Sequence, residues 1–390
     1  MFQSFDVSSA PEQGPPRLAA LRQQMAAEGL DGWLVPRADA WQGETVAPSD
    51  ERLAWLTGFT GSAGFAAVLA GEAGVFVDGR YRVQVRGQVA GDFTPVDFPE
   101  TKLTDWLAAR LGEGARVGFD PWLHTVGEVE ELRKALEPRG IALIPLSTLI
   151  DRIWEDRPAR PSAPMSAYPD ALAGRGSAEK RAEIAGILRD DGHPTAVLTT
   201  PHSIAWLLNV RGSDIERDPI AQAFALVMDD GTVQLFCDPD KAAPVRDHLG
   251  PDVVVLPEDA LLAALQQVDG PVRIDPKTCP EAIRARLAEC ETKVAEASDP
   301  CLLPKARKTP AELDGARAAG ARDALAMIRF LHWLDETAPK GGLTEIDVAT
   351  TLEGFRRESN ALLDISFETI SGAGPNWTAH APRRPATQSR

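Results

Sequence analysis

The chain has 390 residues, a formal net charge of −16, and 44% hydrophobic and 25% charged residues. That length is too great for one hydrophobic core, so we predict two or three domains of ordinary globular composition. The acidic balance argues against nucleic acid and anionic membrane surfaces as partners, because both require a basic footprint.

The N-terminal sequence has no cationic start and carries Asp6 where a signal peptide would be apolar, so we expect no export signal. No apolar run approaches the roughly 18 residues that span a bilayer. The four cysteines, which form no C-x-x-C pair, are Cys237, Cys279, Cys290 and Cys301. We expect them to be free thiols in a reducing cytoplasm rather than a disulfide scaffold.

The first predicted unit begins with a helix over residues 17–30, whose apolar side chains share one face, and a short strand follows it. The same pair of elements returns as a helix over residues 180–192 and another short strand. Each strand is followed by an Ala-Trp segment that we predict to be a further strand. These segments are RLAWLTGF (52–59) and SIAWLLNV (203–210).

Two residue pairs indicate that this order of elements is an internal duplication. Trp55 and Trp206 lie 151 residues apart, and Asp120 and Asp275, each in a V-x-x-D-P segment, lie 155 residues apart. We therefore predict a repeated unit of about 150 residues, each copy a mixed α/β domain whose helices cover a sheet. The alternative is that any two α/β domains share such an order of elements.

A stretch rich in Pro and Gly, residues 152–176, separates the two units. Its prolines each remove a backbone donor and keep the preceding residue out of the α region. They are Pro158, Pro161, Pro164 and Pro169. We predict a linker or a wrapping arm there, not a helix.

A third region begins after a boundary near residues 300–309. A capping box, with Thr309 as N-cap, Pro310 at N1 and Glu312 at N3, opens a long amphipathic helix that ends near Pro339. A second helix should run from about residue 344 to 358. We expect a strand after it, because three apolar residues alternate with polar ones. Those three are Leu363, Ile365 and Phe367.

We find no self-contained catalytic or nucleotide-binding motif. GFTGSAGF (58–65) is placed between strands and predicted as a tight hairpin, because a phosphate cradle would need a helix N-terminus after it. The six histidines are scattered, none with a second His or Cys at metal-ligand spacing, and we expect structural roles for them.

Two charged segments leave alternatives open. In FVDGRYRVQV (76–85), Arg80 is either a solvated arginine at a surface turn capped by Asp78, or a fixed guanidinium that grips a carboxylate or carbonyl group. NVRGSDIERDPI (209–220) alternates in charge sign, which favours a salt-bridged loop. Its length and charge would also suit the lip of a cleft.

Four stretches together resemble the Xaa-Pro aminopeptidases of the long, three-domain kind (aminopeptidase P). In chain order they are FTGSAGFAAVLAGEAGVFVDGRYRVQV, LIDRIWEDRPARP, IAWLLNVRGSDIERDP and SFETISGAGPN. The resemblance runs from about residue 17 to Asn376. It is specific because all four occur in this order and at these spacings.

The resemblance implies an α/β fold of two duplicated creatinase-like mixed-sheet domains, followed by an incomplete pita-bread α+β domain. The expected parts are 1–151, the first creatinase-like domain; 152–176, a linker; 177–303, the second domain; 304–376, the incomplete peptidase domain; and 377–390, an irregular tail.

The resemblance also implies an activity, which is release of an N-terminal residue that precedes proline. Family members use two divalent metals, commonly manganese, and many are homodimers. The implied partners are a peptide with proline at its second position and a second copy of the chain, in the cytoplasm. Arg80 resembles the family's substrate-contacting arginine.

The family's metal ligands, two Asp, one His and two Glu, lie beyond the GPN turn, and only 14 residues follow Asn376 here. We therefore expect a truncated chain with no catalytic residue and no metal ligand, inactive alone. Two hard cations need several anionic oxygens to hold them together.

The tail departs from the family pattern before the chain ends. A substrate-contacting His is expected five positions after Asn376, whereas His380 lies one place early and Trp377 replaces a Gly. We expect residues 377–390 to be off-register, as a shifted reading frame or a truncated product would give. His380 stays the candidate for that substrate contact. The alternatives to an enzyme are a non-catalytic dimerisation or peptide-binding module and a gene product without function.

Overall fold

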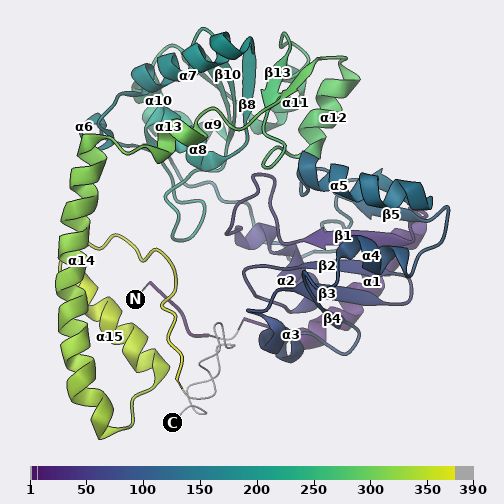
Figure 1. Ribbon diagram of the computed structural model, residues 1–390, viewed down its shortest axis with the longest axis horizontal. Coiled ribbons are helices and arrows are strands. Elements are labelled where there is room, and N and C mark those ends of the chain that lie inside the picture. Colours follow the sequence, from purple (N-terminus) through teal and green to yellow (C-terminus); the bar gives the residue numbers. More distant parts are fainter. Residues whose placement is uncertain (1, 7, 374–390) are drawn as a thin grey trace.

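The computed structural model describes residues 2–6 and 8–373. Two sheet domains and a helical third region surround a common centre, with the first domain at the right, the second at the top and the long helix α14 at the left (Figure 1). Within the described residues, no helix is both long enough and apolar enough to cross a bilayer.

The first sheet has six strands in the order β4-β3-β2-β1-β5-β6. The central β1 pairs antiparallel with β2 and parallel with β5, and both outer pairs, β3 with β4 and β5 with β6, are parallel. The strands are β1 (Gly32–Pro36), β2 (Phe65–Leu69), β3 (Ala73–Val77), β4 (Thr94–Asp97), β5 (Arg116–Phe119) and β6 (Ala142–Pro145).

The second sheet repeats this pattern strand for strand, in the order β12-β11-β10-β8-β13-β14. Its central β8 is antiparallel to β10 and parallel to β13, and its outer pairs are again parallel. The strands are β8 (Thr195–Leu198), β10 (Phe224–Met228), β11 (Val233–Phe236), β12 (Val253–Leu256), β13 (Val272–Ile274) and β14 (Val294–Glu296). The shared order and direction of all six strands confirm the predicted duplication.

Helices cover both sheets and bury their apolar faces against them, which gives each domain its own core. Those of the first domain are α1 (Gly14–Ala27), α2 (Arg52–Thr57), α3 (Arg82–Gln88), α4 (Leu103–Ala108) and α5 (Val126–Leu136). Those of the second are α7 (Ser177–Asp191), α8 (Pro201–Leu208), α9 (Pro239–Ala242), α10 (Arg246–Leu249), α11 (Leu261–Ala264), α12 (Glu281–Glu289) and α13 (Leu302–Ala306).

The two Ala-Trp segments are helices, so the prediction of strands at 52–59 and 203–210 was wrong. They form α2 and α8, and each ends in a left-handed residue, Gly58 (φ 84°) or Asn209 (φ 50°). A short apolar run has the same composition in a buried helix as in a buried strand, and the capping residue distinguishes the two.

The linker is irregular over most of its length, as the prolines predict. It contains one short strand and one helical turn, β7 (Ser166–Ala167) and α6 (Asp170–Ala173). β7 pairs with β9 (Val210–Arg211), so this segment is fastened to the second domain.

Short 3-10 turns occur at η1 (Pro11–Gln13), η2 (Pro48–Asp50), η3 (Glu137–Arg139), η4 (Ala243–Val245), η5 (Glu258–Ala260) and η6 (Ala338–Lys340).

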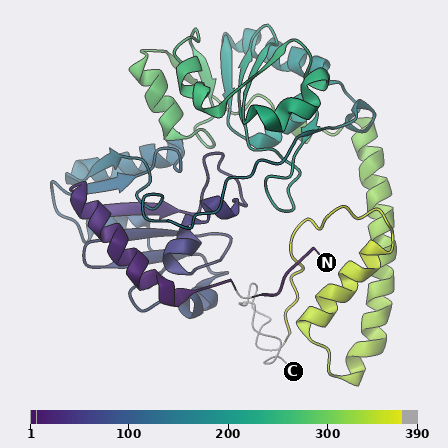
Figure 2. The same ribbon diagram turned by 180° about the vertical axis from the view of Figure 1, so that it is seen from behind.

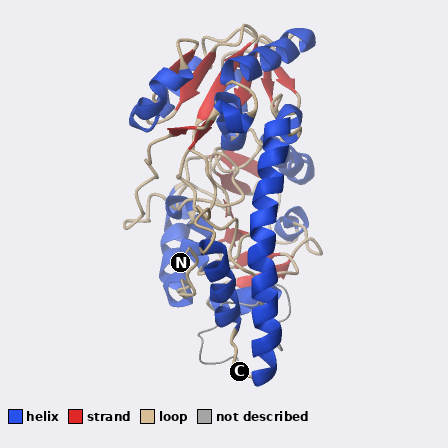
Figure 3. Ribbon diagram, turned by 90° about the vertical axis from the view of Figure 1, so that its left-hand side faces the viewer, coloured by secondary structure: helices blue, strands red, loops and turns tan. Residues whose placement is uncertain are grey.

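The third region consists of α14 (Pro310–Thr337) and α15 (Glu345–Arg357), which pack side by side (Figure 3). The capping box predicted at Thr309 is confirmed, because Thr309 and Glu312 bond each other's backbone N–H groups. α14 buries Ala326 and Phe330. The helical spacing puts three exposed apolar residues on its other side, namely Leu325, Ile328 and Leu331.

The strand predicted at residues 363–368 is not present. Ile365 is buried at 5% exposure, but Leu363 and Phe367 are 91% and 64% exposed, so the three do not share a buried face. A strand needs a ladder partner for its backbone groups, and no sheet among the described residues pairs with this segment.

The two domains meet at their duplicated Asp-Pro turns. The N–H of Val126 donates to the carbonyl of Cys279 (2.9 Å), and the N–H of Glu281 donates to the carbonyl of His124 (3.0 Å). The two donors, Val126 and Glu281, are 155 positions apart, and so are the two acceptors, His124 and Cys279. This is the separation of Asp120 and Asp275. The junction is therefore a pseudo-twofold contact between the same segment of each copy.

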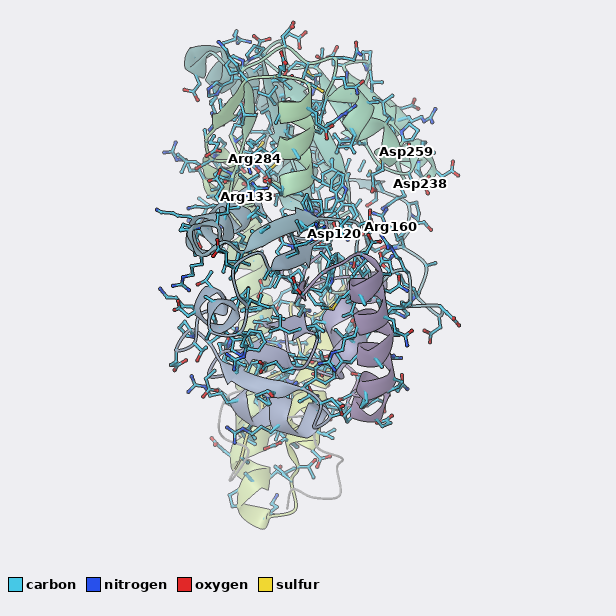
Figure 4. All side chains as sticks on the ribbon, turned by 90° about the vertical axis from the view of Figure 1, so that its right-hand side faces the viewer. Asp120, Arg133, Arg160, Asp238, Asp259 and Arg284 are labelled. Carbon is cyan, nitrogen blue, oxygen red and sulfur yellow. The ribbon has the colours of Figure 1, made fainter. Side chains whose placement is uncertain are left out.

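Side chains reinforce this junction (Figure 4). Arg133 on α5 pairs with Glu281 (2.9 Å), and Arg284 on α12 pairs with Glu130 (3.0 Å). Farther along, Phe224 stacks on Trp41, with ring centroids 5.4 Å apart.

Asp120 and Asp275 hold the two turns in the same way. Asp120 accepts the N–H groups of Trp122 (2.8 Å) and Thr148 (2.9 Å) on its two carboxylate oxygens. Asp275 accepts those of Lys277 (3.0 Å) and Asp299 (2.9 Å). Burial raises the pKa of Asp120, and these N–H groups oppose that rise.

We expect Asp120→Ala and Asp275→Ala each to lower the free energy of unfolding by about 2 kcal/mol or more. Each substitution leaves two backbone N–H groups without a charged acceptor. Urea denaturation followed by tryptophan fluorescence measures this loss. Asp92→Ala, at an exposed position, is the matched control. A loss below about 0.5 kcal/mol in both variants would contradict the assigned role.

Candidate functional site

Arg80 lies at the turn between β3 and α3. Its guanidinium forms an ion pair with Asp78, with Nη2 2.7 Å from Oδ2, and its backbone N–H also donates to Asp78 (2.9 Å). The side chain is 47% exposed. Hydrogen bonds to Asp78 are the main cause that raises the pKa of Arg80, with a small contribution from the Glu44 carboxylate. The guanidinium is thus held in one orientation while part of it faces solvent.

Tyr81, the next residue, anchors this turn in the core. It is buried, its ring meets Phe59 edge-on at 5.7 Å, and its hydroxyl bonds the hydroxyl of Ser62. The Arg80 guanidinium lies 5.1 Å from the Tyr81 ring centroid. The aromatic ring therefore joins the turn to the Gly-rich segment 58–65.

The Gly-rich segment connects α2 to β2, so its prediction as a hairpin between strands was wrong. The side-chain amide of Gln88, on α3, accepts from the Thr60 N–H (3.0 Å) and donates to the Thr60 hydroxyl (2.9 Å). The segment leads directly into β2, which is the strand predicted after it. Its role here is to support the Arg80 turn.

Close packing explains one glycine in this segment. A Cβ on Gly61 would lie 2.2 Å from Cζ of Phe59 and 2.8 Å from Cδ1 of Tyr81. Neither ring can move without disturbing the core beneath the Arg80 turn.

The charged segment 209–220 is a salt-bridged loop, as its alternating charges predicted. Asp214 is buried and pairs with Lys241, also buried. Asp218 bonds His202, with Oδ2 2.8 Å from Nε2. His202 is thus hydrogen-bonded to this loop.

A cavity of about 60 Å³ lies between this loop and the segment that follows β1. Asp39, Glu44 and Asp218 are among its lining residues. Burial raises the pKa of Asp39, whose Oδ2 accepts from the Gln222 side chain (3.1 Å) of the other domain.

The motif LIDRIWEDRPARP contains a charge cluster that we did not predict. Arg52 makes two bonds to Asp151 (2.7 and 2.9 Å) and one to Asp50 (2.8 Å). Arg157 also bonds Asp151, and Trp154 stacks on Trp55 at 5.3 Å. The dense charges and the Trp in the motif were the available signal. This cluster fastens the start of the linker to the first domain.

Lys180 is the buried lysine of α7. Its Nζ donates to the side-chain carbonyl of Asn209 (2.6 Å) and to the backbone carbonyl of Trp206 (3.0 Å). Burial lowers its pKa to about 8. Its partners lie within the second domain, which indicates a structural role.

The four cysteines carry no disulfide, as expected. Burial raises the pKa of Cys237 to about 11, and it also raises the pKa of Cys279 and Cys301. These thiols stay protonated and unreactive near neutral pH.

His380 and the predicted tail 377–390 lie outside the described residues. Within residues 2–6 and 8–373, no group of three or more His, Cys, Asp or Glu side chains could hold a metal ion. Of the predicted site residues, the described structure therefore locates Arg80 alone.

Comparisons with known proteins cover nearly the whole chain. The family model for the creatinase/prolidase N-terminal domain matches residues 17–153, and a second model of that description matches residues 156–312. The probable Xaa-Pro aminopeptidase P of Aspergillus clavatus is 33% identical over 377 residues, which are 92% of this chain and 57% of that protein. Aminopeptidase P2 of Arabidopsis thaliana is 32% identical, over 93% of this chain and 56% of its own length.

One solved structure superposes on most of the chain. It is the X-prolyl aminopeptidase of Caenorhabditis elegans, a cytosolic enzyme with a di-nuclear active site. Its TM-score is 0.83 at 26% identity, and the match covers 91% of this chain and 61% of that one. The chain thus spans about three fifths of the length of the relatives that it matches.

Gly61→Ala should lower the free energy of unfolding by about 1–3 kcal/mol, because the added methyl group overlaps two aromatic rings. Gly71→Ala is the control, since a Cβ there meets nothing within 4 Å. Urea denaturation compares both variants with the unsubstituted chain. Equal stability of the two variants would contradict the packing described around Tyr81.

Proposed function

The chain belongs to the aminopeptidase P family, with two creatinase/prolidase N-terminal domains in tandem, and on that premise we propose that it serves the hydrolysis of Xaa-Pro peptides. The substrate class is a peptide with proline at its second position, as the names of the relatives state for those proteins. The part of this function that the described residues can perform is peptide binding.

We propose that Arg80 binds a carboxylate or a backbone carbonyl of the peptide. The supporting observation is its geometry. Asp78 and the Tyr81 ring restrict the guanidinium, while about half of the side chain stays open to solvent. A planar guanidinium has more donors than one carboxylate can use, so donors are left for a ligand. A restricted side chain loses little conformational entropy on binding.

The pair of metals named for the Caenorhabditis elegans enzyme does not fit the residues described here. A dinuclear centre needs several carboxylate or imidazole ligands, and no such cluster occurs in residues 2–6 and 8–373. We therefore assign no step of the hydrolysis to a metal in these residues. We also propose that hydrolysis by the family's catalytic unit uses manganese, that this protein acts in the cytoplasm, and that it forms a homodimer.

We further propose that α14 and α15 begin a pita-bread domain. α14 exposes Leu325, Ile328 and Leu331 along one side, and apolar residues in such a row are usually covered in a folded assembly. About two fifths of each relative's own length lies outside the part that this chain matches. The proposed division at residues 1–151, 152–176, 177–303 and 304–376 follows from the same premise.

A second candidate function is a peptide-binding or dimerisation module without chemistry. Two observations together favour it. The hydrogen bonds that orient Arg80 are formed within the described residues. The same residues contain no group of three or more His, Cys, Asp or Glu side chains that could hold a metal ion. Peptide binding without turnover would separate this candidate from the enzyme.

Arg80→Ala should weaken binding of the tripeptide Arg-Pro-Pro about tenfold or more, since a charge-assisted hydrogen bond contributes about 1.5–3 kcal/mol. Isothermal titration calorimetry measures the dissociation constants. Arg82→Ala is the matched control, because the Arg82 guanidinium pairs with Asp97 and Glu100. If both variants bound the peptide as the unsubstituted chain does, Arg80 would have no role in binding.

The purified chain alone should show no release of arginine from Arg-Pro-Pro with added manganese. The reason is that no described cluster could hold the two ions. Detection of free arginine by mass spectrometry is the measurement, with a full-length relative as the positive control. Robust turnover that is abolished by a chelator would refute the prediction.

A further inference from the structure

The N-terminal segment leaves the first domain and lies against the third region. In Figure 2 it runs from the first domain to a position beside α15 and the segment that follows it. Chain termini are usually poorly held unless specific contacts fix them. Here Gln3 is 5% exposed, which shows that the segment is inserted between other elements.

The side-chain amide of Gln3 uses both its donor and its acceptor. Its Nε2 donates to Oε2 of Glu353 (3.2 Å) and to the Thr369 hydroxyl (3.5 Å), and its Oε1 accepts from the Thr369 N–H (3.1 Å). The Phe2 N–H donates to the other oxygen of Glu353 (2.9 Å). The two carboxylate oxygens of Glu353 are thus both bonded by the N-terminal segment.

Glu353 is 1% exposed on α15, so its carboxylate is shielded from water and the donors around it stabilise its charge. Arg357, one turn later, is 3.8 Å away. A buried carboxylate that loses hydrogen-bond donors is costly, so the segment and its site stabilise each other.

The second domain reaches the same place through Arg217. Its Nη2 donates to the Phe2 carbonyl (3.2 Å) and pairs with Glu368 (3.5 Å). Arg217 has a left-handed backbone (φ 65°), unusual for a residue with a side chain, in the salt-bridged loop 209–220. The N-terminal segment, the second domain and the third region therefore share one hydrogen-bonded site.

The other end of the segment is held at the Gly-rich segment that supports the Arg80 turn. The Ser9 hydroxyl donates to the Gly58 carbonyl (2.7 Å) at the start of the Gly-rich segment. A Cβ on Gly58 would lie 2.5 Å from the carbonyl of Gln88 and 3.1 Å from Pro11. One short stretch of chain thus connects the support of the Arg80 turn with α15.

We propose that residues 2–6 form a clasp that docks in a peptide-binding site made by Glu353, Thr369 and Arg217. The site recognises an extended peptide by its backbone N–H and carbonyl groups and by the amide of a Gln side chain. Docking fixes α15 relative to the two N-terminal domains. Gln3 and Glu353 are positioning residues, and neither is assigned a contact with substrate.

The test exchanges the amide of Gln3 and the carboxylate of Glu353. Gln3→Glu places a second carboxylate against Glu353 and removes the donor, so the clasp should detach. Glu353→Gln in the Gln3→Glu background supplies an amide donor to the new carboxylate and should restore docking. Gln23→Glu, at an exposed position on α1, is the control for added charge.

Hydrogen–deuterium exchange of the full chain reads out docking. We expect Gln3→Glu to speed exchange in residues 345–369 at least tenfold while exchange in β1, β2 and β3 is unchanged, and we expect the double variant to return to the original rate. Unchanged exchange in Gln3→Glu, or no recovery in the double variant, would overturn the proposal.

A peptide supplied separately tests the site in the Gln3→Glu chain, where the chain's own segment is detached and the docking site is intact. The peptide Phe-Gln-Ser-Phe-Asp should bind Gln3→Glu chains saturably and slow exchange in α15, whereas Phe-Ala-Ser-Phe-Asp should not. Equal effects of the two peptides would contradict recognition of the Gln amide. The result is independent of Arg80, so it remains distinct from the outcome of the Arg-Pro-Pro titration.

Discussion

The contact between the two Asp-Pro turns is the constraint on which the rest of the structure depends. Because the same segment of each copy meets its counterpart, each of these backbone bonds across the junction has a corresponding bond between residues 155 positions away. Backbone bonds of this kind resist sliding more than side-chain contacts do, since they fix register. Asp120 and Asp275 tie each turn to the following segment of its own domain. The duplication therefore supplies both the two domains and the means of joining them.

The candidate binding elements extend from the two joined domains. The Arg80 turn is supported by Tyr81 and the Gly-rich segment in the first domain, and the loop with Arg217 extends from the second. The N-terminal segment bridges from the support of the Arg80 turn to α15. Binding elements on loops and termini need a rigid base to hold their relative positions, and the junction provides one.

Periodicity and capping residues predicted most of the fold, including the duplication, the linker and the capping box of α14. They failed where an apolar run was short, as at Trp55 and Trp206, because a short run shows too little of either period to distinguish a strand from a helix. The prediction of a strand at Ile365 failed for another reason. Alternation of apolar and polar residues favours a strand, but a strand forms only with a ladder partner. Arg80 was identified by resemblance, since its ion pair with Asp78 fits a surface turn equally well. The contact of Gln3 with Glu353 joins residues 350 positions apart, and no local pattern contains it.

The measurement that tests the central claim most directly is a distance distribution between the two domains. Spin labels at Glu113→Cys and Gln267→Cys, both exposed, report on it by double electron–electron resonance, with the unsubstituted chain as background for the native thiols. A rigid pseudo-twofold junction predicts one narrow distance that does not change when peptide is added. A broad or bimodal distribution would show that the domains move independently, and the account of the junction would then be wrong.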